Sequence, residues 1–165
     1  MKQTLLNLAC GTDYREDWIN IDNGSQYPNA KLDKKADILK LKWKDNSVDV
    51  ILVLHYLMYC TPPEVDMLLK RWHGWLKEGG ILEIETGNVY AVCKSILKAK
   101  NLYELHGCNA IGQLYGWGNT HGHRWAWSPV ALKAAMEHAG FKDIALSQGY
   151  YHKNPERDFV ISAKK

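Results

Sequence analysis

A glycine and a carboxylate near the start of the chain have types and spacing suited to binding a nucleotide. Gly11 follows an apolar run at residues 4–9, and Asp22, eleven positions later, ends a second run at residues 18–22. In nucleotide-binding α/β domains, a tight turn after the first strand lets a ligand approach the backbone, and an acid after the second strand binds ribose hydroxyls. The usual gap is about 20 residues. We therefore predict a nucleotide pocket whose first crossover is either a shortened helix or a loop.

The turn lacks the GxGxxG pattern of dinucleotide-binding folds. Ala9, Gly11 and Asp13 occupy the positions at which glycines would be sought. An NAD-dependent oxidoreductase would share the fold, but it requires this glycine-rich pattern. That class of enzyme is therefore kept only as an alternative.

Three residues further along the chain could move a proton during a reaction. Histidine suits this task near neutral pH, and His123 is the first candidate for a base, with His121 behind it. Glu85 is the third candidate, since it ends an expected strand at the carboxyl edge, where open α/β sheets bind ligands. The purely structural alternatives are a loop histidine that orders its segment for His123 and a solvated strand-end charge for Glu85.

The two histidines belong to a long connection, residues 99–128, that is rich in glycine and aromatic residues. Connections of this length are commonly functional. Glycines supply flexibility, whereas aromatic rings supply apolar surface that can grip a substrate or exclude water. We predict that residues 99–128 form a substrate lid or loop.

The same connection contains side chains of the types that bind zinc. They are His106, Cys108, His121 and His123. Their spacing matches no standard zinc site. We therefore predict that the protein has no metal site.

Short apolar or alternating runs predict the strands that position these residues. The expected strands are residues 4–9, 18–22, 36–38, 48–54, 80–86, 143–149 and 158–163. Helices are expected from Thr61 to the Gly79-Gly80 turn, from Asn88 to about Lys100, and from Ser128 to Gly140. This alternation predicts an α/β, Rossmann-like, mostly parallel sheet with helices on both faces. The last two strands, joined by a polar turn at residues 152–157, predict an antiparallel C-terminal edge hairpin.

The composition is that of an ordinary globular chain. The 165 residues carry a formal net charge of +3, and 46% of them are hydrophobic, which fits a single domain over residues 1–165. The charge is too small to indicate nucleic acid as a partner. None of the four cysteines forms a CxxC pair, and neither a secretory pattern nor an apolar run of membrane length is present. We therefore expect a cytoplasmic protein with reduced thiols and no membrane contact.

Five motifs in chain order resemble the class I S-adenosylmethionine-dependent methyltransferases. They are the first motif at residues 6–12, the second strand at 18–22, the adenine-binding segment at 36–38, the fourth-strand motif at 46–51 and the segment leading into the fifth strand at 75–82. The chain is most similar to a compact branch with a short first crossover and a Trp-x-Asn-x-Asp second strand. That branch also has a Gly-Gln element and a histidine followed by aromatic residues before its last helix, which resemble Gly112-Gln113 and residues 123–128 here.

The resemblance implies S-adenosyl-L-methionine as the cofactor and gives a set of residues that would bind it. These are Asn7, Ala9, Cys10, Gly11, Asp22, Asp37, Ile38 and His55. The backbone of residues 9–11 would approach the methionine part of the cofactor, and Asp22 would hold the ribose. Asp37 would contact the adenine amino group, Ile38 would pack on the adenine ring, and His55 would face the pocket.

Two of these positions depart from the pattern of the family. Asn7 stands where many relatives carry an acid, and Ala9 stands where they usually carry glycine. An alanine is tolerable at this position if the backbone keeps a negative φ.

The sequence thus predicts an S-adenosylmethionine-dependent methyltransferase that acts on an oxygen or nitrogen atom. A small molecule is the favoured acceptor, with proteins and nucleic acids behind it. The chain has no Asn/Asp-Pro-Pro-Tyr element, which would indicate methylation of amino groups on bases or amides. A catalytically silent adenosyl-binding or interaction protein is the alternative that stands beside the NAD-dependent oxidoreductase.

Overall fold

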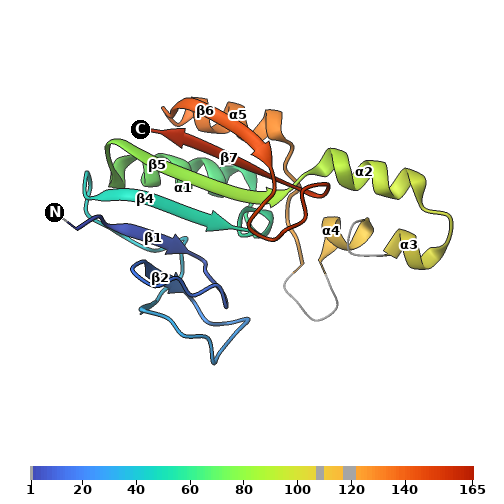
Figure 1. The fold of residues 1–165 in the computed structure, drawn as a ribbon, viewed down its shortest axis with the longest axis horizontal. Helices are drawn as coiled ribbons and strands as arrows, with labels where there is room; N and C mark the ends of the chain where they lie inside the picture. Colours follow the sequence, from blue (N-terminus) through green and yellow to red (C-terminus); the bar gives the residue numbers. More distant parts are fainter. Residues whose placement is uncertain (1, 107–109, 117–121) are drawn as a thin grey trace.

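A computed structural model describes residues 2–106, 110–116 and 122–165 of the chain. Its centre is a seven-stranded sheet with the strand order β3-β2-β1-β4-β5-β7-β6 (Figure 1). The strands are β1 (Leu5–Leu8), β2 (Ile19–Asp22), β3 (Lys34–Lys35), β4 (Val48–Leu54), β5 (Leu76–Gly87), β6 (Lys142–Gln148) and β7 (Asp158–Lys164). Strands β1 to β5 pair in parallel, whereas β7 pairs antiparallel with both β5 and β6. The predicted Rossmann-like, mostly parallel sheet with an antiparallel C-terminal pair is therefore confirmed.

The third strand differs in position from the expected residues 36–38. It consists of Lys34 and Lys35, and Ala36 makes one further bond, from its amide to the Asp22 carbonyl. The chain then turns, because the Asp37 carboxylate accepts a hydrogen bond from the Leu39 amide at 3.0 Å. Such an Asx turn competes with the strand ladder for the backbone, so the segment around Asp37 leaves the sheet instead of extending it.

The structure contains one 3-10 helix and five α-helices in its described residues. They are η1 (Leu57–Tyr59), α1 (Pro62–Trp75), α2 (Val89–Lys98), α3 (Leu102–His106), α4 (Ile111–Tyr115) and α5 (Pro129–His138). Thr61 and Glu64 form the expected capping box at the start of α1. The end of α1 lies earlier than predicted, because Leu76 already belongs to β5 and the Gly79-Gly80 pair lies inside that strand, with Gly79 at a φ of 74°. None of the described helices is long and apolar enough to cross a membrane.

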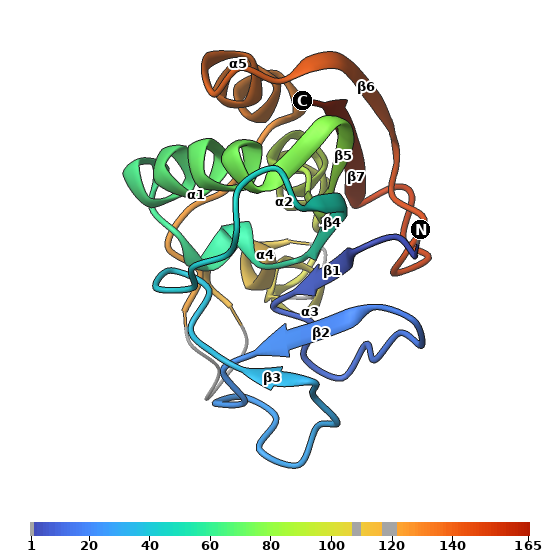
Figure 2. The same cartoon turned by 90° about the vertical axis from the view of Figure 1, so that its left-hand side faces the viewer.

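The main core lies between one face of the sheet and the helices α1 and α5. Leu6, Ile51, Leu82 and Ala163 pair in one row across four strands, and all four are buried. Figure 2 shows α1 and α5 together on this side of the sheet. The sequence predicts helices on both faces, but the first three connections between strands are loops, so α1 and α5 make the main helix contacts with the sheet from one face.

The short helices α2, α3 and α4 lie beyond the carboxyl ends of β4 and β5 (Figure 1). They contact one another and place the described parts of residues 99–128 at that end of the sheet. A strand-like segment after α4 is held by three bonds: the Arg124 and Trp125 amides donate to the Met58 carbonyl, and the Trp127 indole donates to the Leu57 carbonyl at 3.2 Å. These bonds connect the end of the long connection to η1.

The first crossover, between β1 and β2, is a loop. This is one of the two alternatives that the sequence predicts, the other being a shortened helix. The side chains of this loop are organised by Asn20, which is 0% exposed. The Asn20 amide group donates to the carbonyls of Arg15 and Trp18 and to the Asp33 carboxylate, and its oxygen accepts from Asn7 and from the Arg15 amide. One buried side chain therefore replaces the backbone hydrogen bonds that a crossover helix would provide.

Candidate functional site

A cavity of about 500 Å³ opens at the carboxyl ends of the first four strands. After β1 the chain adds β2 and β3 on one side and then returns to add β4 on the other. Ligands in open α/β sheets bind at such a reversal of strand order, outside the carboxyl ends of the strands. Its walls include the segments that follow β1 and β4, residues 9–13 and 54–56. The cavity therefore lies at the place that the topology favours for a ligand.

The loop after β1 brings the predicted nucleotide-binding residues together. The Asp22 carboxylate accepts hydrogen bonds from the Gly11 amide at 3.1 Å and from the Gly24 amide at 2.7 Å. Gly11 has a φ of 52°, and a side chain there would meet the Tyr27 ring at 3.2 Å. The carboxylate is thus fixed beside the turn, and each of its oxygens keeps acceptor capacity for a further donor.

Ala9 does not meet the condition of a negative φ under which an alanine is tolerable at this position. Its φ is 53°, a left-handed conformation that costs an alanine about 1 to 2 kcal/mol. The position keeps the conformation of a glycine, because the chain must turn directly after β1. His55, after β4, has a similar φ of 51°. Two strained residues thus flank the cavity, and strain of this kind concentrates at functional sites.

Seven of the eight predicted cofactor residues line the cavity. These seven are Ala9, Cys10, Gly11, Asp22, Asp37, Ile38 and His55. Asn7 is the exception: its side chain is 0% exposed and donates to the Asp13 carbonyl and to Asn20, so it supports the loop from beneath. Burial and the nearby Asp22 raise the pKa of the Cys10 thiol to about 12, which makes this cysteine a poor nucleophile.

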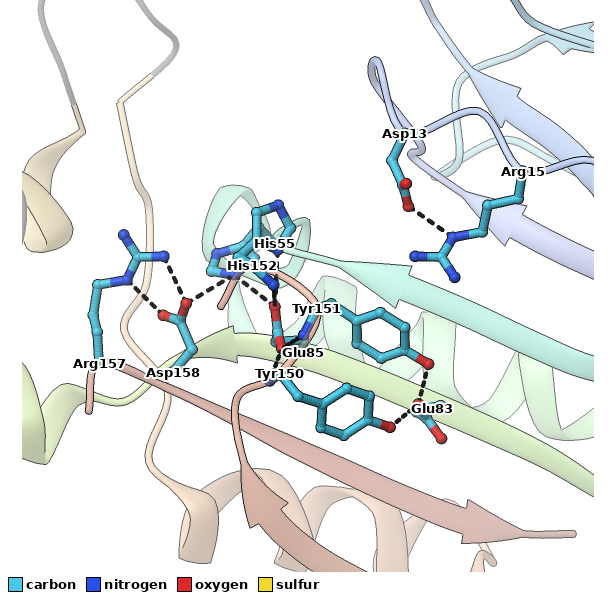
Figure 3. Close-up of polar contacts among 10 residues, drawn as sticks. All are labelled: Asp13, Arg15, His55, Glu83, Glu85, Tyr150, Tyr151, His152, Arg157 and Asp158. Atoms are coloured by element: carbon cyan, nitrogen blue, oxygen red, sulfur yellow. Dashed lines mark hydrogen bonds and ion pairs between the residues drawn. The ribbon is translucent and has the colours of Figure 1, made fainter. Parts of the chain in front are cut away.

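A cluster of titratable side chains lies on the β4 and β5 side of the cavity (Figure 3). Glu85 is 0% exposed, and its carboxylate lies 2.8 Å from Nδ1 of His152 and 3.4 Å from Nε2 of His55. The same Nε2 lies 3.4 Å from the Asp158 carboxylate, which also receives two hydrogen bonds from Arg157. The rings of His55 and His152 are in edge contact at 4.3 Å. Both histidines line the cavity, whereas Glu85 lies behind them.

The electrostatics of this cluster are dominated by two ionised carboxylates. Burial alone would raise the pKa of Glu85, but donors from His152, His55 and the backbone of residues 151–152 hold it well below its usual range. Asp158 shows the same balance, with His55 and Arg157 as the groups that lower its pKa. Burial opposes a charge on His55, yet Asp158 and Glu85 outweigh it and raise the pKa of His55 above its ordinary value. The two carboxylates thus favour a positive charge on His55.

The depressed pKa of Glu85 makes a prediction about stability and pH. Its folded pKa lies below the ordinary value of 4.5, so its contribution to stability is present above that value and is lost as the pH falls below it. Glu85→Gln removes the charge that four donors contact, which should lower the free energy of unfolding by about 2 kcal/mol near neutral pH. Urea denaturation at about pH 7 and about pH 3.5 should show the difference between the two proteins shrinking at the lower pH.

The matched control for this experiment is Glu137→Gln, which changes an exposed ion pair on α5. Exposed pairs contribute little, so this variant should follow the wild type at both pH values. A Glu85→Gln deficit of the same size at both pH values would contradict an ionised, stabilising Glu85.

The remaining candidates for proton transfer lie apart from the cavity or outside the described residues. His123 is half-buried, with Nδ1 2.7 Å from the Gln113 carbonyl and its ring in edge contact with Tyr59, a cavity residue. Burial lowers the pKa of His123, and this effect is larger than the opposing rise caused by the hydrogen bond with the Gln113 carbonyl. His121 and Cys108 lie outside the described residues. His152 is a cavity residue that sequence reasoning missed, although it opens the polar turn predicted between the last two strands.

Comparison with known proteins agrees with this fold. An S-adenosylmethionine-dependent methyltransferase from Archaeoglobus fulgidus superposes with a TM-score of 0.66 at 16% identity, over 99% of this chain and 86% of the other. One from Mesorhizobium loti gives 0.68 at 16% identity, over 98% and 90% of the two chains. One from Clostridium acetobutylicum gives 0.67 at 14% identity, over 99% and 84%. No curated protein matches the chain in sequence.

The strand order and the position of the cavity therefore define a protein with the class I methyltransferase fold. Residues 4–84 match the family described as "Methyltransferase domain", so this part of the chain is similar to methyltransferases, and the solved structures that share its fold include S-adenosylmethionine-dependent enzymes. The matched residues run from β1 into β5 and include every strand that borders the cofactor side of the cavity.

Proposed function

We propose that this protein transfers a methyl group from S-adenosylmethionine to an oxygen or nitrogen atom of a small-molecule acceptor. One observation carries the proposal: a single cavity joins two carboxylates suited to a nucleoside, Asp22 and Asp37, with two histidines, His55 and His152. The first pair suits a cofactor that contains adenosine. The second pair suits an acceptor that must lose a proton.

The residues on the cofactor side fit S-adenosylmethionine in chemistry and order. Asp37 and Ile38 follow β3, Asp22 ends β2, and residues 9–11 follow β1. Adenine, ribose and methionine would thus lie along successive strands of the sheet. When bound, the cofactor supplies an electrophilic methyl group on a positively charged sulfur.

The acceptor side of the cavity is bounded by aromatic and charged residues. Tyr56 and Tyr59 come from the segment around η1, and Gly122 and Arg124 come from the end of the long connection. Arg124 is held in place by an ion pair with Glu64 at 2.9 Å. We propose that the described parts of residues 99–128 cover a bound acceptor. A volume of about 500 Å³ lies in the range of small-molecule sites, which supports a metabolite over a macromolecule as the acceptor.

Calorimetry separates this proposal from its rivals. We expect S-adenosylmethionine and S-adenosylhomocysteine to bind the purified protein with one site each, and NAD to give no heat of binding. Binding of NAD without binding of either adenosyl ligand would reject the proposal in favour of an oxidoreductase. Adenosyl binding together with no methyl release over a broad panel of hydroxyl and amine acceptors would instead favour a silent binding protein.

A further inference from the structure

We propose that His152 is the general base of the methyl transfer, and that Glu85 and His55 are positioning residues that fix its tautomer and its orientation. The inference rests on the proposed function, because it assigns the group that removes the proton of the acceptor. It identifies a residue in the turn between β6 and β7, a part of the chain outside the matched family segment.

Glu85 determines which nitrogen of His152 carries the proton. An ionised carboxylate can only accept hydrogen bonds, so the 2.8 Å contact requires Nδ1 of His152 to donate. The His152 backbone amide donates to the same oxygen at 3.0 Å, while the Tyr150 and Tyr151 amides donate to the other oxygen at 2.8 Å each. Glu85 therefore binds both the backbone and the ring of His152, and the lone pair lies on Nε2.

The charged groups around His152 distinguish it from His55. The groups that face it are Glu85 from β5 and His55 from the end of β4, and beyond His55 the pair Asp158 and Arg157 at the start of β7. Of the two carboxylates, Glu85 contacts the His152 ring through Nδ1, whereas Nε2 of His55 faces both Glu85 and Asp158. Nε2 of His152 is therefore the histidine nitrogen of this cluster that can take a proton from an acceptor.

The position of His152 in the cavity matches this role. The cofactor residues follow β3, β2 and β1 in turn, so the acceptor must approach from the side of β4 and β5, where His152 lines the cavity. Glu85 cannot touch an acceptor, because it is 0% exposed behind the histidines. His55 is unsuited as a base, since its Nε2 lies between two carboxylates at 3.4 Å each.

The proposed step balances in atoms and electrons. A lone pair of the acceptor oxygen or nitrogen forms the bond to the methyl carbon, and the carbon–sulfur bond breaks with its electron pair going to sulfur. The proton of the acceptor moves to Nε2 of His152 and forms an imidazolium that Glu85 stabilises through Nδ1. The side chain of His152 is 46% exposed, so this proton can then pass to solvent.

The tautomer can be measured without knowing the acceptor. Long-range proton–nitrogen NMR spectra of ¹⁵N-histidine-labelled protein, with His152 assigned from the His152→Gln variant, should show that the neutral ring carries its proton on Nδ1 and none on Nε2. A proton on Nε2 in the neutral ring would overturn the proposal. This readout is independent of whether the protein binds S-adenosylmethionine.

Kinetics with a probe acceptor complete the test. The probe is the member of a panel of phenols, alcohols and primary amines that accepts most labelled methyl from S-adenosylmethionine. We expect His152→Gln to lower kcat about 100-fold or more with a much smaller change in KM. His138→Gln, on the exposed surface of α5, should match the wild type. A large loss in His123→Gln together with unchanged kcat in His152→Gln would transfer the role to His123 and reject this assignment.

A metal ion is the competing occupant of this cluster. Ligand atoms of His55, Glu85 and His152 lie within 4.8 Å of one another, which suits two histidines and a carboxylate around a divalent cation. Calorimetric titration with Zn²⁺ should give no stoichiometric site that disappears in His152→Gln. Such a site would reject the base, because the metal would occupy Nδ1 in place of its proton. Failure of both adenosyl ligands to bind would instead reject the proposed function and leave the NMR result to decide the tautomer.

Discussion

Replacing Asp22 with alanine is expected to weaken the binding of S-adenosylmethionine and S-adenosylhomocysteine about 100-fold. The substitution removes the carboxylate that would accept the ribose hydroxyls, and hydrogen bonds to a charged acceptor contribute about 1.5 to 3 kcal/mol each. It also releases the Gly11 and Gly24 amides, which now donate to this carboxylate. The turn that approaches the methionine part of the cofactor would therefore lose its anchor as well as its ribose contact.

Calorimetric titration with both adenosyl ligands measures this effect, and two further variants locate its source. Asp22→Asn keeps one acceptor oxygen without the charge, so its loss of affinity should be smaller than that of the alanine variant. Asp66→Asn, on the outer surface of α1, should bind like the wild type. Wild-type affinity in Asp22→Ala would remove the ribose role from this residue.

Replacing Asn20 with alanine is expected to lower the free energy of unfolding by about 3 kcal/mol or more. Five hydrogen bonds of the first crossover end on this fully buried side chain. Each buried donor or acceptor left without a partner costs about 1 to 3 kcal/mol, and water reaches only part of the vacated space. The loop would lose the support that fixes residues 9–18 in place of a helix.

Urea denaturation followed by circular dichroism provides the measurement, with Asn29→Ala as the matched control, since Asn29 is exposed in the loop after β2. The control should lie within about 0.5 kcal/mol of the wild type. Equal stability of Asn20→Ala and the wild type would show that the crossover is held by its backbone alone.

Local patterns were enough to predict most of the elements of this protein. The apolar runs around Leu8, Ile21 and Ile51 form buried strands, and the caps at Asn88 and Ser128 begin helices at the expected residues. Such features depend on residues within a few positions of each other, which is the range over which side-chain period and capping act. The differences, at the third strand and at the end of α1, arise where an Asx turn and strand pairing compete with the local pattern.

Some residues of the candidate site can likewise be predicted from the local sequence, whereas others depend on contacts between residues far apart in the chain. The sequence alone determines that Gly11 and Asp22 follow successive strands, and carboxyl ends of parallel strands share one edge of the sheet. Whether His123 or another histidine faces the cavity depends on how distant segments pack, and the pairing of Glu85 with His152 joins residues 67 positions apart. The tertiary structure decides this contact because β6 runs parallel to β5 with β7 returning between them, which brings the turn after β6 to the carboxyl end of β5.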